Sequence, residues 1–74
     1  MQKQRNYGDV HFNYGDEQQY QTLQQMGLTK IEAFDRVIEA KKQMLTAHRI
    51  RASKGNEMSE KLVEQMEWEL GDHA

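Results

Sequence analysis

Apolar residues recur at helical spacing through the middle of the chain. Thr29 and Glu32 form a capping box at the start of this pattern. The pattern continues to about Ser53 and stops at Gly55. It places five apolar side chains on one helix face: Ile31, Phe34, Val37, Ile38 and Leu45. The sequence therefore predicts a long amphipathic helix over residues 30–53.

A shorter helix is predicted before it, over residues 17–26. Asp16 is expected to be its N-cap, with Gln19 in the capping-box position. Gly27 is expected to end the helix in a left-handed conformation. Three apolar residues recur at three-residue spacing and form one narrow face: Tyr20, Leu23 and Met26.

A third helix is predicted from near Asn56 or Ser59 to just before Gly71. Its apolar face consists of residues spaced by four, with one neighbour beside them: Met58, Leu62, Met66, Leu70 and Val63. The chain has no proline, which agrees with uninterrupted helices. The expected fold class is all-α, a small three-helix bundle with one short, one long and one medium helix.

Residues 1–15 form a polar N-terminal tail that contains aromatic side chains. Val10, Phe12 and Tyr14 alternate with polar residues, which is the period of a half-buried strand. The pattern offers no second strand, and one strand cannot form a sheet alone. The tail is therefore mobile, laid across the helices by its aromatic side chains, or paired with another chain, and the second placement is favoured. The expected division is a tail over 1–15 and a helical domain over 16–74.

Length and composition exclude several classes of protein. The 74 residues are enough for one small domain with a thin stability margin. Because the chain has no cysteine, disulfides and thiolate zinc sites are excluded. No apolar run approaches the roughly 18 residues that a membrane span needs, and the N-terminus lacks the apolar stretch of a secretory signal. We expect a soluble, cytoplasmic protein that does not associate with membranes.

The residue pattern gives no support for catalysis. His11, His48 and His73 are scattered and lack a second ligand at helical spacing. No nucleophile–base pair, phosphate-binding glycine loop or paired-carboxylate motif is found. We predict that the protein is not an enzyme and needs neither a metal nor a cofactor.

Charge is segregated along the chain. Residues 30–55 carry seven basic and three acidic side chains, a net charge of +4, whereas residues 56–74 carry one basic and six acidic side chains, a net charge of -5. One interpretation is intramolecular: the basic long helix and the acidic third helix lie side by side with their charges facing. The other is that one of these surfaces attracts a partner.

Basic residues interrupt the apolar face of the long helix over residues 41–54. Lys41, His48 and Arg49 fall on the same face as Leu45. One hypothesis is a surface that contacts phosphates or carboxylates through five side chains: Lys41, His48, Arg49, Arg51 and Lys54. The alternative is that this stretch projects beyond a small bundle and is simply solvated.

The single tryptophan, Trp68, lies opposite the apolar face of the third helix. An exposed tryptophan with methionine neighbours is typical of an interface, and Glu64 and Glu67 would belong to the same contact. The alternative is that Trp68 packs on the first helix or on the aromatic tail and completes the core of a monomer.

Residues 22–37 have a helix–glycine–helix pattern that is similar to a helix-turn-helix. In such a motif the second helix enters the major groove with its N-terminal residues on the bases. Here these residues include Glu32 and Asp35, whose carboxylates repel phosphate. The electrostatics therefore disfavour sequence-specific DNA binding.

The function that the sequence favours is a small regulatory or adaptor protein that acts by binding another protein. Self-association as a homodimer through the same surface is a further hypothesis. A chain of this kind would suit a phage- or plasmid-type modulator of host machinery, although no motif points to one. The alternative function is nucleic-acid binding through residues 22–37 or the basic stretch 41–54.

Overall fold

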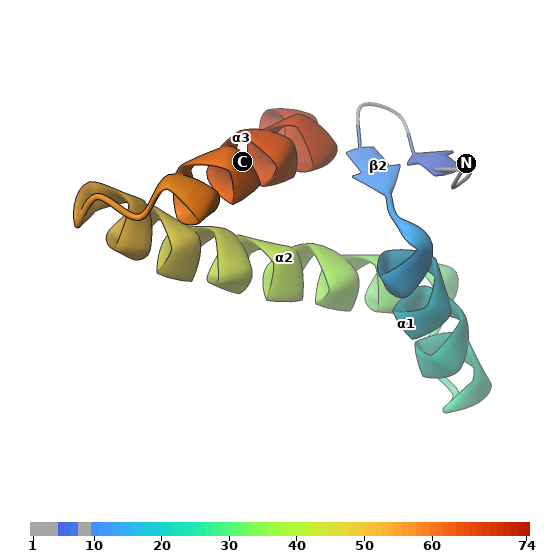
Figure 1. The fold of residues 1–74 in the computed structure, drawn as a ribbon. Helices are drawn as coiled ribbons and strands as arrows, with labels where there is room; N and C mark the ends of the chain where they lie inside the picture. The colour runs from blue at the N-terminus through green and yellow to red at the C-terminus, as the bar shows by residue number, and fades with distance from the viewer. Residues whose placement is uncertain (1–4, 8–9) are drawn as a thin grey trace.

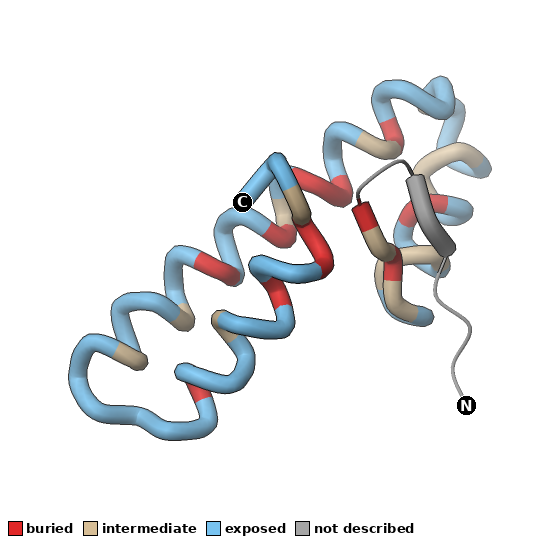
Figure 2. Tube along the Cα trace, turned by 90° about the horizontal axis from the view of Figure 1, so that it is seen from above, coloured by how far each residue is buried: buried red, intermediate tan, exposed pale blue. Residues whose placement is uncertain are grey.

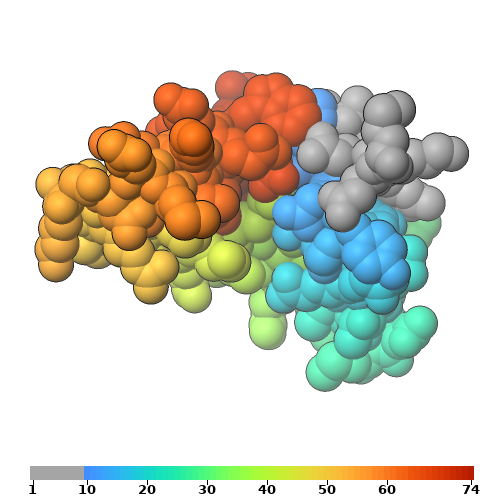
Figure 3. Space-filling view, viewed as in Figure 1, coloured from blue at the N-terminus to red at the C-terminus, as the bar shows by residue number. Residues whose placement is uncertain are grey.

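The computed structural model describes residues 5–7 and 10–74. They form a short antiparallel β-hairpin and three helices (Figure 1): β1 (Arg5–Tyr7), β2 (Val10–Phe12), α1 (Tyr14–Gln25), α2 (Lys30–Ser53) and α3 (Glu57–Leu70), with a 3-10 turn (Gly71–His73) after α3. The predicted all-α class and small three-helix bundle are confirmed. The molecule is elongated, about 41 × 24 × 20 Å, with α1 and β2 at one end and the α2–α3 turn at the other (Figure 3).

The first helix begins earlier than predicted. Its N-cap is Asn13, whose side-chain oxygen accepts the backbone N–H of Asp16 at 2.9 Å. In return, the Asp16 carboxylate accepts the backbone N–H of Asn13 at 3.1 Å, which completes a capping box. The prediction of Asp16 as the N-cap is therefore wrong, because Asp16 occupies the third helical position and helix α1 starts at Tyr14.

Two glycine turns join the three helices as predicted. Gly27 and Gly55 have φ of 105° and 88°, a left-handed conformation that favours glycine. After Gly55, Asn56 donates its backbone N–H to the Arg51 carbonyl at 3.3 Å and accepts the backbone N–H of Ser59 on its side chain at 3.0 Å. Asn56 thus closes α2 and caps α3, so the two helices reverse direction within a few residues.

The predicted capping box of α2 is also confirmed. The Thr29 hydroxyl accepts the backbone N–H of Glu32 at 3.2 Å, and the Glu32 carboxylate accepts the backbone N–H of Thr29 at 3.0 Å. The backbone hydrogen bond from Thr29, followed by the contact with its hydroxyl, lowers the pKa of Glu32 below its ordinary value.

The β2 strand completes the hydrophobic core between α1, α2 and α3. Val10 and Phe12 are fully buried, and the Phe12 ring lies 5.7 Å from that of Tyr20 and 5.6 Å from that of Phe34. The favoured placement of the tail across the helices is therefore confirmed for residues 10–12. The expectation that no second strand exists is wrong, because β1 pairs with β2 and Tyr7 lies opposite Val10.

Buried positions lie on the facing sides of α2 and α3 and on β2 (Figure 2). The core is formed by nine hydrophobic side chains: Val10, Phe12, Tyr20, Ala33, Val37, Ile38, Leu45, Met66 and Leu70. Four residues predicted on apolar helix faces are exposed instead: Met26 at 71%, Ile31 at 76%, Met58 at 76% and Leu62 at 41%. Ile31 lies in the first turn of α2, and Met58 lies in the first turn of α3, beside the α2–α3 turn and away from the end where α1 and β2 lie.

Candidate binding site

A buried ion cluster joins the three helices. The Lys41 ammonium of α2 lies 2.8 Å from Glu69 Oε1 of α3 and pairs with Asp16 Oδ2 of α1. The side chains of Lys41, Asp16 and Glu69 are 5%, 13% and 5% exposed. A buried charge is tolerated when it is paired and hydrogen-bonded, and Lys41 has a carboxylate partner on each neighbouring helix.

Lys41 therefore has a different role from the one that the sequence predicted. It lies on the core face of α2, as the helical spacing requires, but its side chain is buried against the other helices and is not part of an exposed basic surface. Its ammonium is already bound by two carboxylates of its own chain, and the side chain lines a pocket beside them.

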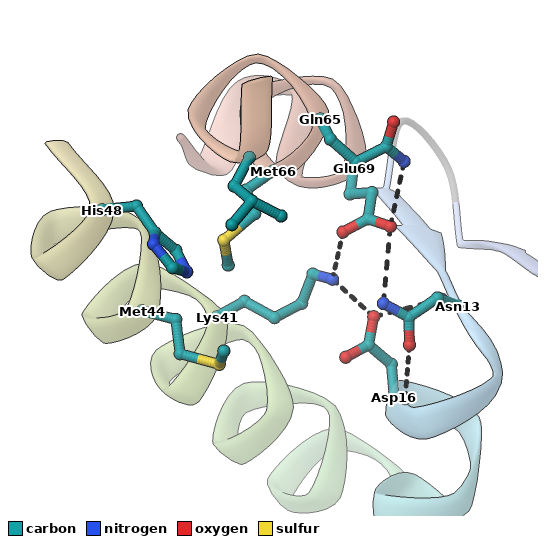
Figure 4. Close-up of a pocket in the computed structure, with 9 residues that line it drawn as sticks. Asn13, Asp16, Lys41, Met44, His48, Gln65, Met66 and Glu69 are labelled. Atoms are coloured by element: carbon teal, nitrogen blue, oxygen red, sulfur yellow. Dashed lines mark hydrogen bonds and ion pairs between the residues drawn. The ribbon is translucent and has the colours of Figure 1, made fainter. Parts of the chain in front are cut away.

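Two amide side chains complete the polar surroundings of Glu69 (Figure 4). Asn13 Nδ2 and Gln65 Nε2 donate to Glu69 Oε2 at 3.4 and 3.2 Å, while Lys41 donates to Glu69 Oε1. Glu69 thus accepts hydrogen bonds from α2, from α3 itself and from the residue that caps α1. The cluster fixes the relative positions of the three helices.

A pocket of about 190 Å³ opens beside this cluster, between α2 and α3. One end is polar and is formed by the ion cluster with its amide partners; the walls are apolar and are formed by Met44, Leu62 and Met66 (Figure 4). His48 also lines the pocket, and its Nδ1 is buried without a hydrogen-bond partner in the described part of the chain. Buried polar atoms are rarely left without a partner, so His48 Nδ1 is an exception within this site.

The other predicted basic residues do not form one patch. Arg49 pairs with Glu67 at 2.8 Å, and these side chains are 48% and 45% exposed. Arg51 and Lys54 are exposed, and Arg51 lies two residues from Arg49, which places it about 200° further round the helix. The expected facing of basic α2 and acidic α3 is thus observed at Arg49–Glu67 and at Lys41–Glu69.

Trp68 packs on the tail and is also partly exposed, so it has features of both roles that the sequence left open. Its ring stacks on His11 of β2, with the ring centres 4.1 Å apart and the planes 13° apart, so it packs on the tail. It nevertheless remains 52% exposed. Glu64, one turn before it on the same helix, is also exposed.

Several large apolar side chains are exposed on the α2–α3 hairpin. Met44 and Leu62 are 56% and 41% exposed and line the mouth of the pocket. Met58 is 76% exposed and lies one helical turn before Leu62, on the same side of α3. We call Met44, Met58 and Leu62 the apolar face.

Sequence reasoning missed four members of the site: Asn13, Asp16, Gln65 and Glu69. One signal pointed to them, since a lysine on the core face of an amphipathic helix needs an acidic partner. The partners lie 25 and 28 residues from Lys41 in the sequence, so no local pattern connects them.

The comparisons with protein-family models, curated proteins and solved structures gave no match to this chain. Within the described ranges, none of the helices has the length and apolarity to cross a bilayer. The same residues contain no group of three or more His, Cys, Asp or Glu side chains placed to hold a metal ion.

Proposed function

We propose that the protein is a small, non-catalytic adaptor or regulator that binds another protein through the α2–α3 hairpin. The observation that carries this proposal is the exposure of the apolar face, Met44, Met58 and Leu62, at 41–76% beside a core of nine hydrophobic residues. In a chain with so small a core, apolar side chains left in water favour association with a partner.

Trp68 supports a contact that extends round α3. It lies six residues after Leu62, which corresponds to about 120° round the helix axis. A half-exposed tryptophan that is held by a ring stack loses little rotational freedom on binding, and tryptophan is enriched among residues that dominate interfaces. A partner that covers the outer side of α3 would contact both Leu62 and Trp68.

The charges around α3 indicate the character of such a partner. The exposed acidic side chains of this helix surround its apolar residues: Glu57, Glu60, Glu64 and Glu67. An acidic rim increases the rate of encounter with a basic surface and disfavours acidic ones. We therefore propose a protein partner with basic residues around an apolar groove.

Nucleic-acid binding has weaker support. Of the five residues in the predicted basic surface, Lys41 is bound inside the molecule and Arg49 pairs with Glu67. Glu32 and Asp35, at the start of α2, are exposed where a recognition helix would meet DNA. A salt-dependent titration with duplex DNA that weakens on replacing Arg51 and Lys54 by alanine would favour this alternative over the protein partner.

The experiment that tests the proposal is affinity capture from the cells that produce the chain, with matched variants. Leu62→Gln and Trp68→Ala should lose the same captured protein, with affinity reduced at least about tenfold. Ile31→Gln is the matched control, because Ile31 is as exposed as Met58 but lies in the first turn of α2.

Equal capture by all variants would reject the α2–α3 surface. The solution mass, measured by light scattering, distinguishes a second copy of this chain from a different protein as the partner on this surface. A dimer that Leu62→Gln converts to a monomer would make the partner another copy of this chain, and a monomeric wild type would leave a different protein as the partner.

A further inference from the structure

The charges that line the pocket do not balance. Lys41 contributes one positive charge, and Asp16 and Glu69 contribute two negative charges, while His48 is the remaining titratable group of the lining. Amide N–H groups of Asn13 and Gln65 stabilise part of this excess. The three charged side chains of the ion cluster therefore give this end of the pocket a net negative charge, and each of them is at most 13% exposed.

Asp16 and His48 each have a side-chain atom without a hydrogen-bond partner among the described residues. Asp16 uses Oδ2 for both Lys41 and the backbone N–H of Asn13. Its other oxygen has no hydrogen bond within the described residues, and Asp16 lines the pocket (Figure 4). Nδ1 of His48 is the second acceptor, in the tautomer that carries the proton on Nε2.

The walls between these atoms suit an alkyl stem. Met44, Leu62 and Met66 supply thioether and branched aliphatic surfaces that adapt to the shape of an inserted chain. A cavity of roughly 150 Å³ accommodates a benzene molecule in another protein, so the 190 Å³ here is enough for a long side chain.

We infer that the pocket receives a basic side chain of the partner protein, with arginine favoured over lysine. This inference rests on the proposed function. Arginine suits a pocket with a negatively charged end because its planar guanidinium has five N–H donors and is weakly hydrated. Its alkyl stem would lie along Met44 and Leu62, and its charge would balance the second carboxylate beside Lys41.

The position of the pocket supports a side chain from a partner. Its mouth is lined by Met44 and Leu62, two of the three residues of the apolar face, so a protein that covers this face also covers the pocket. A metal ion is not the occupant that these residues favour, because the described residues provide no cluster of three ligands.

The test is a nuclear magnetic resonance titration of the full chain with N-acetyl-arginine amide, observed at the methionine methyl groups and at His48. The uncharged control probe is N-acetyl-citrulline amide, which has nearly the same shape. We expect the arginine probe to shift Met44, Met66 and His48 in a saturable manner and to bind at least about tenfold more tightly than the citrulline probe.

Asp16→Asn is the key variant, because it removes the excess charge and one acceptor while leaving Lys41 paired with Glu69. Asp16→Asn should weaken binding of the arginine probe at least about tenfold. The control Glu39→Gln removes an exposed carboxylate on α2, outside the pocket, and should leave binding unchanged. If Asp16→Asn does not fold, His48→Phe provides the second variant, with the loss of one acceptor and several-fold weaker binding expected.

Three results would overturn the inference. Equal binding of both probes would exclude recognition of charge, and unchanged binding in Asp16→Asn and His48→Phe would place the probe elsewhere. Much tighter binding of agmatine, a free amine with the same guanidinium, would make the occupant a small molecule. None of these results contradicts the proposed function if wild type captures a partner protein and Leu62→Gln does not. If the wild-type chain captures no protein, the proposed function itself is contradicted.

Discussion

Lys41 Nζ lies 2.8 Å from Glu69 Oε1, and both side chains are 5% exposed. The two residues are 28 positions apart and come from the two long helices of the hairpin, so this contact sets how α3 lies along α2. With Asp16 as the third member, one lysine connects all three helices.

Replacing Lys41 by methionine should be strongly destabilising. The substitution leaves two buried carboxylates without their cation, a change that costs about 3–5 kcal/mol in comparable buried pairs. A domain of this size has a small free energy of unfolding, so the variant should already be largely unfolded without urea. A urea titration followed by circular dichroism measures this. The matched control is Lys42→Met at the neighbouring exposed position, which should change the free energy of unfolding by less than about 0.5 kcal/mol.

A double variant distinguishes the cost of leaving carboxylates unpaired from the cost of altered packing at Lys41. Lys41→Met combined with Glu69→Gln should be more stable than Lys41→Met alone, because one of the two unpaired carboxylates is removed. Simple additivity of the two single effects would show that Lys41 and Glu69 do not interact and would contradict the buried cluster.

Trp68→Ala should lower stability only modestly. The variant loses the ring stack with His11, and such aromatic contacts contribute about 0.5–1.5 kcal/mol beyond the area they bury. Leu70→Ala, two residues away and fully buried, should cost about 2–5 kcal/mol. Equal losses in the two variants, measured by denaturant unfolding, would make Trp68 a core residue.

The capping box at Thr29 should make stability depend on pH in the acid range. Because the pKa of Glu32 is lowered in the folded state, the carboxylate stabilises the fold fully above its ordinary pKa. This contribution decreases as the pH falls below about 4.3 and is lost once the pH passes the lowered pKa of the folded state. Thr29→Ala should raise the pKa of Glu32, as followed by carboxyl carbon resonances, whereas Thr46→Ala within the same helix should leave it unchanged.

Two glycine substitutions should have opposite effects. Gly55→Ala should destabilise by about 1–2 kcal/mol, because φ of 88° strains any residue with a Cβ. Gly15→Ala should stabilise by about 0.5 kcal/mol, since Gly15 is helical and the new methyl would be 3.4 Å from Asn13 Oδ1, an ordinary contact. Thermal unfolding of both variants checks the two signs, and a stabilised Gly55→Ala would contradict the left-handed turn.

Local signals in the sequence were sufficient for the helices and their turns. The capping box at Thr29 and the left-handed turn at Gly27 depend on residues within a few positions of each other, so they could be predicted. The start of α1 could not, because Asn13 and Asp16 are both good N-caps. The structure uses Asn13 as the cap, which leaves the Asp16 carboxylate in position for Lys41.

Contacts between distant segments were not predictable in the same way. Helical spacing placed Lys41 on the core face, but its partners belong to other helices, so a solvated or partner-binding role was the natural interpretation. The β1 strand gave no pattern of its own, because three residues are too few to show the alternation of a strand. Met58 and Leu62 of the apolar face were predicted on the apolar side of the third helix, because spacing alone does not show where neighbouring elements end.

The central claim is that the apolar face binds a protein, and site-specific photo-crosslinking tests it most directly. A photoreactive phenylalanine analogue would replace Leu62 in one variant and Ile31 in another, both in the cells that produce the chain. The proposal predicts one discrete crosslinked protein at position 62 and none at position 31. The same products at both positions, or none at position 62, would contradict it.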